Sequence, residues 1–133
     1  MRLKILIITL LISWNAIAEE KTWFCTTEKR GGLIYRDSGA WEATTFTPAR
    51  MTVKQNDMTL SFSEPFKGFI KRCEPLFTHT YKDTIQCAGS SKTFILNTTT
   101  GLATSSQIWG WISGSLDSDY DTLSTSLWRC EPF

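Results

Sequence analysis

Histidine and closely spaced cysteines are scarce in this chain of 133 residues. It has one histidine, His79, and four cysteines, none of them in a Cys-x-x-Cys pair. A structural zinc site needs closely spaced Cys or His pairs, and a thioredoxin-like redox site needs Cys-x-x-Cys, so the spacing argues against both. The chain also lacks a Gly-x-Ser-x-Gly elbow and a phosphate-binding glycine-rich loop. It therefore carries none of the usual sequence signals of a serine hydrolase or a nucleotide enzyme, and no cofactor is expected.

An excess of charge of one sign is also missing. There are 14 Lys and Arg residues against 13 Asp and Glu, which gives a formal net charge of +1. A nucleic-acid binder usually has a strong basic excess or a basic face, so no nucleic-acid partner is expected. With 41% hydrophobic and 20% charged residues the chain has the composition of a folded protein. Its length allows a single domain.

The only long apolar run lies at the N-terminus. Arg2 and Lys4 precede the run Ile5–Ile12, and residues 16–18 (Ala-Ile-Ala) fit the small-x-small cleavage rule. This pattern predicts a secretory signal peptide over residues 1–18, and a buried N-terminal helix is the alternative. The run is too short to span a bilayer, so no membrane anchor is expected after cleavage. The predicted location is the periplasm or the extracellular medium.

The four cysteines, Cys25, Cys73, Cys87 and Cys130, all follow this segment. An even number of cysteines in a small exported chain predicts disulfides, here two. Three pairings are possible. The nested pairing, Cys73–Cys87 with Cys25–Cys130, is favoured because the first bond would join neighbouring strands and the second would tie the first strand to the last.

Residues 19–133 are predicted to form one domain of short strands. No sustained helical period is present, and β-branched or aromatic runs alternate with turn residues. The expected fold class is all-β, a single small antiparallel barrel or sandwich of about eight strands with two disulfides. Gly31-Gly32 is expected to end the first strand, and a helical turn is possible around residues 64–69. Strand-like runs lie near residues 22–27, 33–36, 41–47, 51–54, 58–62, 66–73, 78–81, 84–88, 93–96, 102–112 and 120–130. The runs 51–54 and 58–62 are expected to form a hairpin with Met58, Leu60 and Phe62 on one side, and a turn is expected at Asp37-Ser38-Gly39.

Several short motifs resemble a group of small uncharacterised exported proteins of bacteria and their phages. The motifs are Thr52-Val53-Lys54, Cys87-Ala88-Gly89, Phe94-Ile95-Leu96-Asn97, Thr100-Gly101 and the terminal Cys130-Glu131-Pro132-Phe133. The resemblance covers most of residues 19–133 and implies a periplasmic or secreted setting. Its motifs are structural, so it implies no particular activity.

A second, partial resemblance is to the periplasmic inhibitors of c-type lysozyme, which are small disulfide-bearing β-barrels. Their lysozyme-facing loop carries Ser-Gly-x-x-Tyr, and this chain has Ser38-Gly39-Ala40-Trp41 followed by Glu42 where the pattern has Tyr. The resemblance implies a partner-binding loop. Its candidate residues are Arg36, Asp37, Ser38, Gly39 and Trp41.

Two other clusters are candidate binding sites. Trp109 and Trp111 share one face of any strand and would stack on a sugar or aromatic ligand if exposed, whereas buried indoles would fill the core. Asp117, Asp119 and Asp121 also alternate, and carboxylates are typical calcium ligands, but the loop fails the EF-hand pattern at Thr122 and Trp128. An acidic solvated turn is the simpler interpretation, so no metal site is expected beyond this weak candidate.

Enzymatic residues are weakly indicated. His79 would need a nearby Ser or Cys and a carboxylate, and the cysteines are expected to be oxidised. Nothing in the spacing selects a glycosidase pair among four further carboxylates, which are Glu42, Glu64, Glu74 and Asp83. We therefore expect a non-enzymatic exported protein that binds a protein or small ligand. The alternatives are an inhibitor of a cell-wall hydrolase such as lysozyme, and a small cell-wall-directed hydrolase.

Overall fold

The computed structural model describes residues 19–68, 72–76, 82–108 and 122–133, and within these ranges every regular element is a β-strand. The expected all-β class with two disulfides is confirmed, with nine strands in place of about eight. No helix in the described part is long and apolar enough to cross a membrane. The strands are β1 (Lys21–Tyr35), β2 (Trp41–Thr45), β3 (Arg50–Asn56), β4 (Thr59–Phe62), β5 (Arg72–Pro75), β6 (Thr84–Gly89), β7 (Lys92–Asn97), β8 (Leu102–Ile108) and β9 (Thr122–Pro132).

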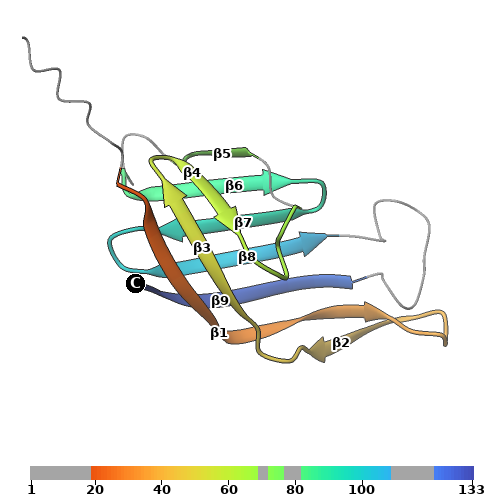
Figure 1. Ribbon diagram of the computed structural model, residues 1–133. Coiled ribbons are helices and arrows are strands. Elements are labelled where there is room, and N and C mark those ends of the chain that lie inside the picture. Colours follow the sequence, from red (N-terminus) through yellow and green to blue (C-terminus); the bar gives the residue numbers. More distant parts are fainter. Residues whose placement is uncertain (1–18, 69–71, 77–81, 109–121) are drawn as a thin grey trace, which may run out of the picture.

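The strands form one antiparallel sheet that curls into a nearly closed barrel (Figure 1). Its order is β4-β3-β1-β9-β8-β7-β6-β5, and the two outer strands approach one another where the backbone N–H of Leu60 donates a 3.4 Å hydrogen bond to Cys73 Sγ. β1 is long enough to pair with β3 along its first half and with β2 along its second half. The second half of β1 forms a hairpin with β2 at the margin of the sheet while it remains paired with β9, and the turn of the hairpin projects past the end of β9 (Figure 1).

β1 passes through the glycine pair without a break, so the prediction that Gly31-Gly32 ends the strand is wrong. Both glycines remain in register with β2 and β9, after a shift in register between Thr27 and Lys29. A Cβ on Gly32 would lie 1.8 Å from the carbonyl oxygen of Leu123. The glycine is thus needed because another strand's backbone passes close by, which is a recognised use of glycine inside a strand.

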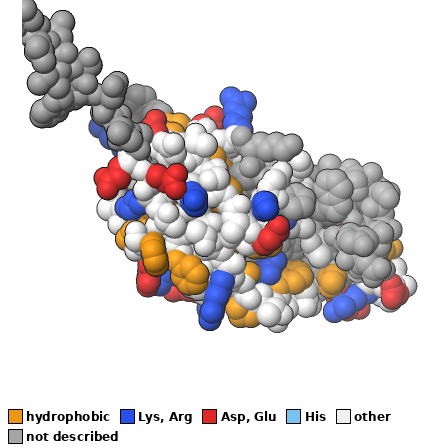
Figure 2. Space-filling view, in the orientation of Figure 1, with side chains coloured by type: hydrophobic (Ala, Val, Ile, Leu, Met, Phe, Trp, Pro, Cys, Tyr) orange, Lys and Arg blue, Asp and Glu red, His pale blue; other side chains and the backbone are white. Residues whose placement is uncertain are grey.

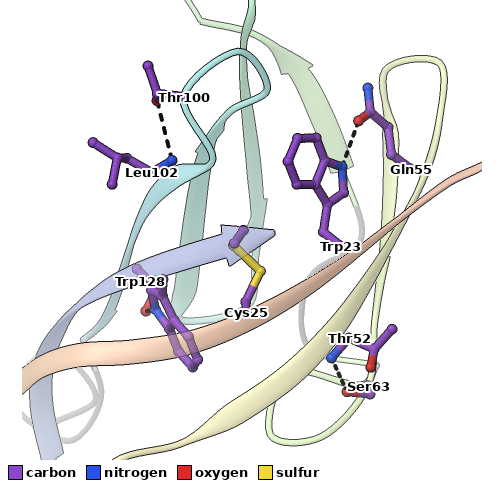
Figure 3. Close-up of a disulfide and its surroundings, with 10 residues drawn as sticks. Trp23, Cys25, Thr52, Gln55, Ser63, Thr100, Leu102 and Trp128 are labelled. Atoms are coloured by element: carbon purple, nitrogen blue, oxygen red, sulfur yellow. Dashed lines mark hydrogen bonds between the residues drawn. A yellow bond between two sulfur atoms is a disulfide. The ribbon is translucent and has the colours of Figure 1, made fainter. Parts of the chain in front are cut away.

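Large side chains make up the core of the barrel. Figure 3 shows two of them, Trp23 and Trp128, near the disulfide of Cys25. Phe94 packs against Phe62, Phe66 and Trp128, with ring centroids 5.1–6.5 Å apart. Aromatic clusters of this kind supply most of the buried apolar area in a small domain. The buried core residues are Trp23, Cys25, Met51, Val53, Leu60, Phe66, Ile85, Cys87, Phe94, Leu96, Ala103, Trp128 and Cys130.

The two disulfides have the nested pairing that the spacing favoured. Cys25 of β1 is bonded to Cys130 of β9, and Cys73 of β5 is bonded to Cys87 of β6. Each pair occupies directly opposite positions of neighbouring strands. Together the disulfides indicate an oxidising environment outside the cytoplasm.

The chain between β4 and β5 departs from the sequence predictions. No helical turn forms over the described residues 64–68. The N–H of Phe66 instead donates to the carbonyl of Ser63, in a turn that contains the cis Glu64–Pro65 bond. The described strand begins at Arg72 rather than at residue 66. By contrast, the hairpin of β3 and β4 is confirmed, and Leu60 is buried between Met58 and Phe62, which also contact the core.

Candidate functional site

The candidate site is the β1–β2 hairpin, which holds the loop that the sequence singled out. The turn Arg36–Gly39 is closed by the N–H of Gly39, which donates to the carbonyl of Arg36 at 2.8 Å. The N–H of Arg36 then donates to the carbonyl of Ala40 at 2.9 Å. Gly39 has φ of +78°, the left-handed conformation that glycine adopts without steric cost. These are the features of a three-residue hairpin loop that ends in a glycine.

Two side-chain pairs hold the strands together next to the turn. Tyr35 and Trp41 face one another across the hairpin, with ring centroids 5.5 Å apart. The Nε of Arg36 donates to Oε2 of Glu42 at 3.2 Å. Both charged side chains are about half exposed, so the ion pair contributes little to stability but favours one arrangement of the turn. The tip thereby presents Asp37 and Ser38 on a defined backbone.

The hairpin is unusual within this protein because neither of its faces is fully buried. β3 alternates buried and exposed positions, whereas β2 has no buried residue and the second half of β1 has none. A two-stranded ribbon without cover is marginally stable by itself. Here the hairpin is stabilised by β9, which pairs with β1 as far as Ile34.

An aliphatic row crosses the outer face at the base of the hairpin. Ala43 of β2 lies opposite Leu33 of β1, Leu33 lies opposite Leu123 of β9, and Leu123 lies opposite Ile108 of β8. Leu33 is 37% exposed and Ile108 is 52% exposed. Nearby on the same face, Leu127 is 49% exposed. We call Ala43, Leu33, Leu123 and Ile108 the aliphatic row.

A shallow hollow of about 210 Å³ accompanies this row. The space-filling view shows hydrophobic side chains along the lower border of the molecule, where Figure 1 places β1, β2 and β9, with Lys and Arg side chains between them (Figure 2). Exposed apolar side chains that lie together in this way are typical of interaction surfaces. The hollow is lined by Gly32, Leu33, Ser106, Gln107, Ile108, Leu123, Ser124 and Thr125.

One cation lies partly inside the barrel. The Nζ of Lys92 donates to the carbonyl of Pro65 at 3.3 Å and lies 5.1 Å from the ring centre of Phe66. Burial lowers the pKa of Lys92 below its ordinary value, and the nearby charge of Arg30 lowers the pKa further, while Glu64 opposes the shift. The ammonium group of Lys92 therefore has a structural role, which no pattern in the sequence indicated.

Two further hollows lie on the surface of the barrel. One of about 370 Å³ is bordered by β3, β4 and the following turn, and one of about 610 Å³ lies beside Phe133 at the end of β9. Both are wide open, and their linings mix charges of both signs. In the first hollow the hydroxyl of Ser63 accepts a hydrogen bond from the N–H of Thr52 and donates one to the carbonyl of Glu64, so its partners there are backbone groups.

Several candidates from the sequence lie outside the described residues. They are His79, the pair Trp109 and Trp111, and the trio Asp117, Asp119 and Asp121. Within the ranges that the structure describes, no group of three or more His, Cys, Asp or Glu side chains is arranged to hold a metal ion.

The four carboxylates considered for glycoside hydrolysis lie on separate elements. Glu42 belongs to β2 and is paired with Arg36. Asp83 precedes β6 and accepts a 2.8 Å hydrogen bond from the hydroxyl of Thr99. Glu64 lies in the turn after β4, and Glu74 lies in β5. Each thus has its own surroundings, and none shares a described hollow with another of the four.

Sequence reasoning found the hairpin tip through its Asp-Ser-Gly turn, but it missed the aliphatic row. The row depends on the register of four strands, of which only the alternation along each strand is visible in the sequence. No family model matches this chain, and no curated protein or solved structure is significantly similar to it.

Proposed function

We propose that this protein is an exported, non-enzymatic binding protein that contacts a protein partner through the tip of the β1–β2 hairpin. The observation that carries the proposal is the hairpin itself, a ribbon in which no residue is fully buried and which ends in a well-formed turn. Building such an element outside the core costs conformational entropy and buries little apolar area. A contact role explains why the chain keeps it.

The composition of the tip supports a protein partner. An aromatic pair, Tyr35 and Trp41, lies directly behind the turn, and an arginine, Arg36, flanks it. Tyr, Trp and Arg are the residues that most often dominate the energy of protein interfaces. The filled barrel interior offers no comparable internal site among the described core residues.

A photo-crosslinking experiment tests this proposal. A photoreactive residue at Ser38 is expected to capture a specific partner in periplasmic extract, whereas the same residue at Asp57, in the exposed β3–β4 turn, is not. Binding of the purified partner should then weaken at least about tenfold in Ser38→Arg and remain unchanged in Asp57→Arg. Equal crosslinking from both turns, or normal binding by Ser38→Arg, would contradict the proposal.

Inhibition of a cell-wall hydrolase such as lysozyme is the second candidate function. Ser38-Gly39, the residues of the partial resemblance, lie at the projecting end of the hairpin, where they are able to enter a substrate cleft. The expected result is slower lysis of cell walls by c-type lysozyme in the presence of the protein, with the effect lost in Ser38→Arg and kept in Asp57→Arg. Unchanged lysis at a large molar excess would exclude lysozyme as the target.

Export is part of the same proposal. The predicted signal peptide over residues 1–18 and the two disulfides both favour a periplasmic or secreted protein. Intact mass measurement of protein from the periplasm or medium is expected to give a chain that begins at Glu19. A folded, oxidised protein that still carries residues 1–18 would refute cleavage at this position.

A further inference from the structure

The outer edge of β2 exposes backbone hydrogen-bonding groups. The hairpin bonds from Arg36 N–H to the Ala40 carbonyl and from Phe46 N–H to the Arg30 carbonyl fix which residues of β2 turn toward β1. Because bonded and non-bonded pairs alternate in an antiparallel ladder, the N–H and C=O groups of Ala43 and Thr45 point away from β1. No strand in the described part of the chain pairs with β2 on that side.

This edge lacks several of the usual features that protect an edge strand against pairing. Natural edge strands carry lysine, proline or a bulge that discourages another strand from adding to them. β2 reads Trp-Glu-Ala-Thr-Thr and has none of these within its bounds, and its one charge, Glu42, is already paired with Arg36. The strand has only five residues, which limits the strength of a contact along this edge but does not prevent one.

We propose that two copies of this chain associate by antiparallel pairing of their β2 strands about a twofold axis at Ala43. In this register the N–H and C=O groups of the two Ala43 residues exchange two hydrogen bonds. Glu42 of each copy lies opposite Thr44 of the other, so no like charges face each other across the pair. The proposal does not rest on the hairpin tip binding a foreign partner.

The aliphatic row is the reason to prefer a second copy over an unrelated peptide. The row ends at Ala43, the same residue that turns its backbone to the open edge. Pairing at Ala43 joins the rows of the two copies end to end into one continuous band of eight aliphatic residues. An unrelated strand would continue the row only if its own sequence happened to match.

The geometry leaves both hairpin tips accessible. Antiparallel strands point in opposite directions, so the two Asp37-Ser38-Gly39 turns lie at opposite ends of the shared ribbon. A dimer of this kind presents two copies of the tip and gains avidity for a partner that displays more than one binding site.

Sedimentation equilibrium over concentrations up to about 1 mM tests the self-association, since a contact of this size belongs to the weak class. The native protein is expected to form a concentration-dependent dimer. Ala43→Pro removes the edge-facing N–H without removing a hairpin bond, and Ala43→Lys places two charges face to face; each should raise the dimer dissociation constant at least about tenfold. An unchanged unfolding midpoint in either variant shows that the fold is intact.

Cysteine crosslinking tests the register. Opposite residues of a hydrogen-bonded pair lie about 5.5 Å apart at Cα, within the range that a disulfide spans. Ala43→Cys is therefore expected to form a covalent dimer under mild oxidation, and Thr45→Cys, on the same face of the same strand, is not. A monomer at every concentration, a dimer insensitive to both Ala43 variants, or equal crosslinking from the two cysteines would overturn the proposal.

Discussion

The indole of Trp128 is tied to Ser105 inside the barrel. Its Nε1–H donates a 2.8 Å hydrogen bond to Oγ of Ser105 on the neighbouring strand, and both residues are buried. A buried indole N–H needs such a partner because it has lost its hydrogen bond to water. The pair lets a large side chain fill the core without leaving its polar atom unsatisfied.

Ser105→Ala is expected to destabilise the protein by about 1–3 kcal/mol, since the Trp128 N–H keeps its burial and loses its acceptor. Urea unfolding measures the change. In Trp128→Phe the donor is absent, so the further substitution Ser105→Ala should cost markedly less there than in the native protein. If Ser105→Ala lowers the free energy of unfolding equally in the native protein and in Trp128→Phe, the hydrogen bond contributes nothing to stability.

The two disulfides should differ in their contribution to stability. Cys25–Cys130 closes a loop of 105 positions and Cys73–Cys87 closes one of 14. Loop-closure entropy predicts a loss of about 4.7 kcal/mol for Cys25→Ala with Cys130→Ala, and about 3 kcal/mol for Cys73→Ala with Cys87→Ala. Denaturant unfolding of the two double variants gives the order. A larger loss from the shorter loop would mean that packing, rather than chain entropy, dominates.

Gly101 is expected to tolerate no side chain. It has φ of +70°, and a Cβ there would lie 2.2 Å from the carbonyl oxygen of Cys130. Gly39 has a similar φ of +78°, but its Cβ would meet only the Tyr35 hydroxyl, at 3.8 Å. Gly39→Ala should therefore cost about 1–2 kcal/mol, the penalty of the left-handed conformation alone.

Gly101→Ala should cost clearly more, because the neighbouring strand must also move. Thermal unfolding of the two alanine variants compares them under identical conditions. Similar melting temperatures would show that β9 shifts away easily at this point.

Lys92 should make stability rise at alkaline pH. Its pKa is lowered in the folded protein by burial and by Arg30, against an ordinary value of 10.5 in the unfolded chain. Between these two pKa values the unfolded state binds more protons, so the free energy of unfolding increases with pH and levels off above 10.5. Below the lowered pKa, Lys92 is charged in both the folded and the unfolded state. The burial of its charge then lowers the free energy of unfolding by the full amount.

Lys92→Met should remove this part of the pH dependence. Lys54→Met is the matched control, because Lys54 is exposed beside Glu20 and only its surface ion pair is lost. Urea unfolding between pH 8 and pH 10.5 measures both variants. If the free energy of unfolding rises with pH as steeply in Lys92→Met as in the native protein, the pH dependence comes from other groups.

Much of the fold could be predicted from short-range patterns. The alternation of Met58, Leu60 and Phe62 predicted the β3–β4 hairpin and its inward face, which the structure confirms. The Asp37-Ser38-Gly39 turn was visible because its glycine adopts the left-handed conformation that the turn needs. The hairpin tip is therefore the part of the candidate site that could be predicted from the sequence.

Other features depended on contacts between distant segments. From the sequence, Gly32 is expected to break the strand. Its role becomes clear only because the backbone of Leu123 passes beside it in the structure. From the sequence, Lys92 has no feature that distinguishes it from a surface lysine. In the structure its ammonium group contacts the Phe66 ring and the Pro65 carbonyl. In both cases the residue type is local information, whereas its role is set by a neighbour many positions away.

Local patterns were enough to predict a small all-β fold with two disulfides, because side-chain alternation, turn residues and an even number of cysteines can be recognised along the chain. The three-dimensional structure was needed to show that β1 pairs with three strands, with β3 along its first half, with β2 along its second half, and with β9 along most of its length. Strand order and register depend on which distant segments pair, and the alternation of side chains is equally compatible with several pairings.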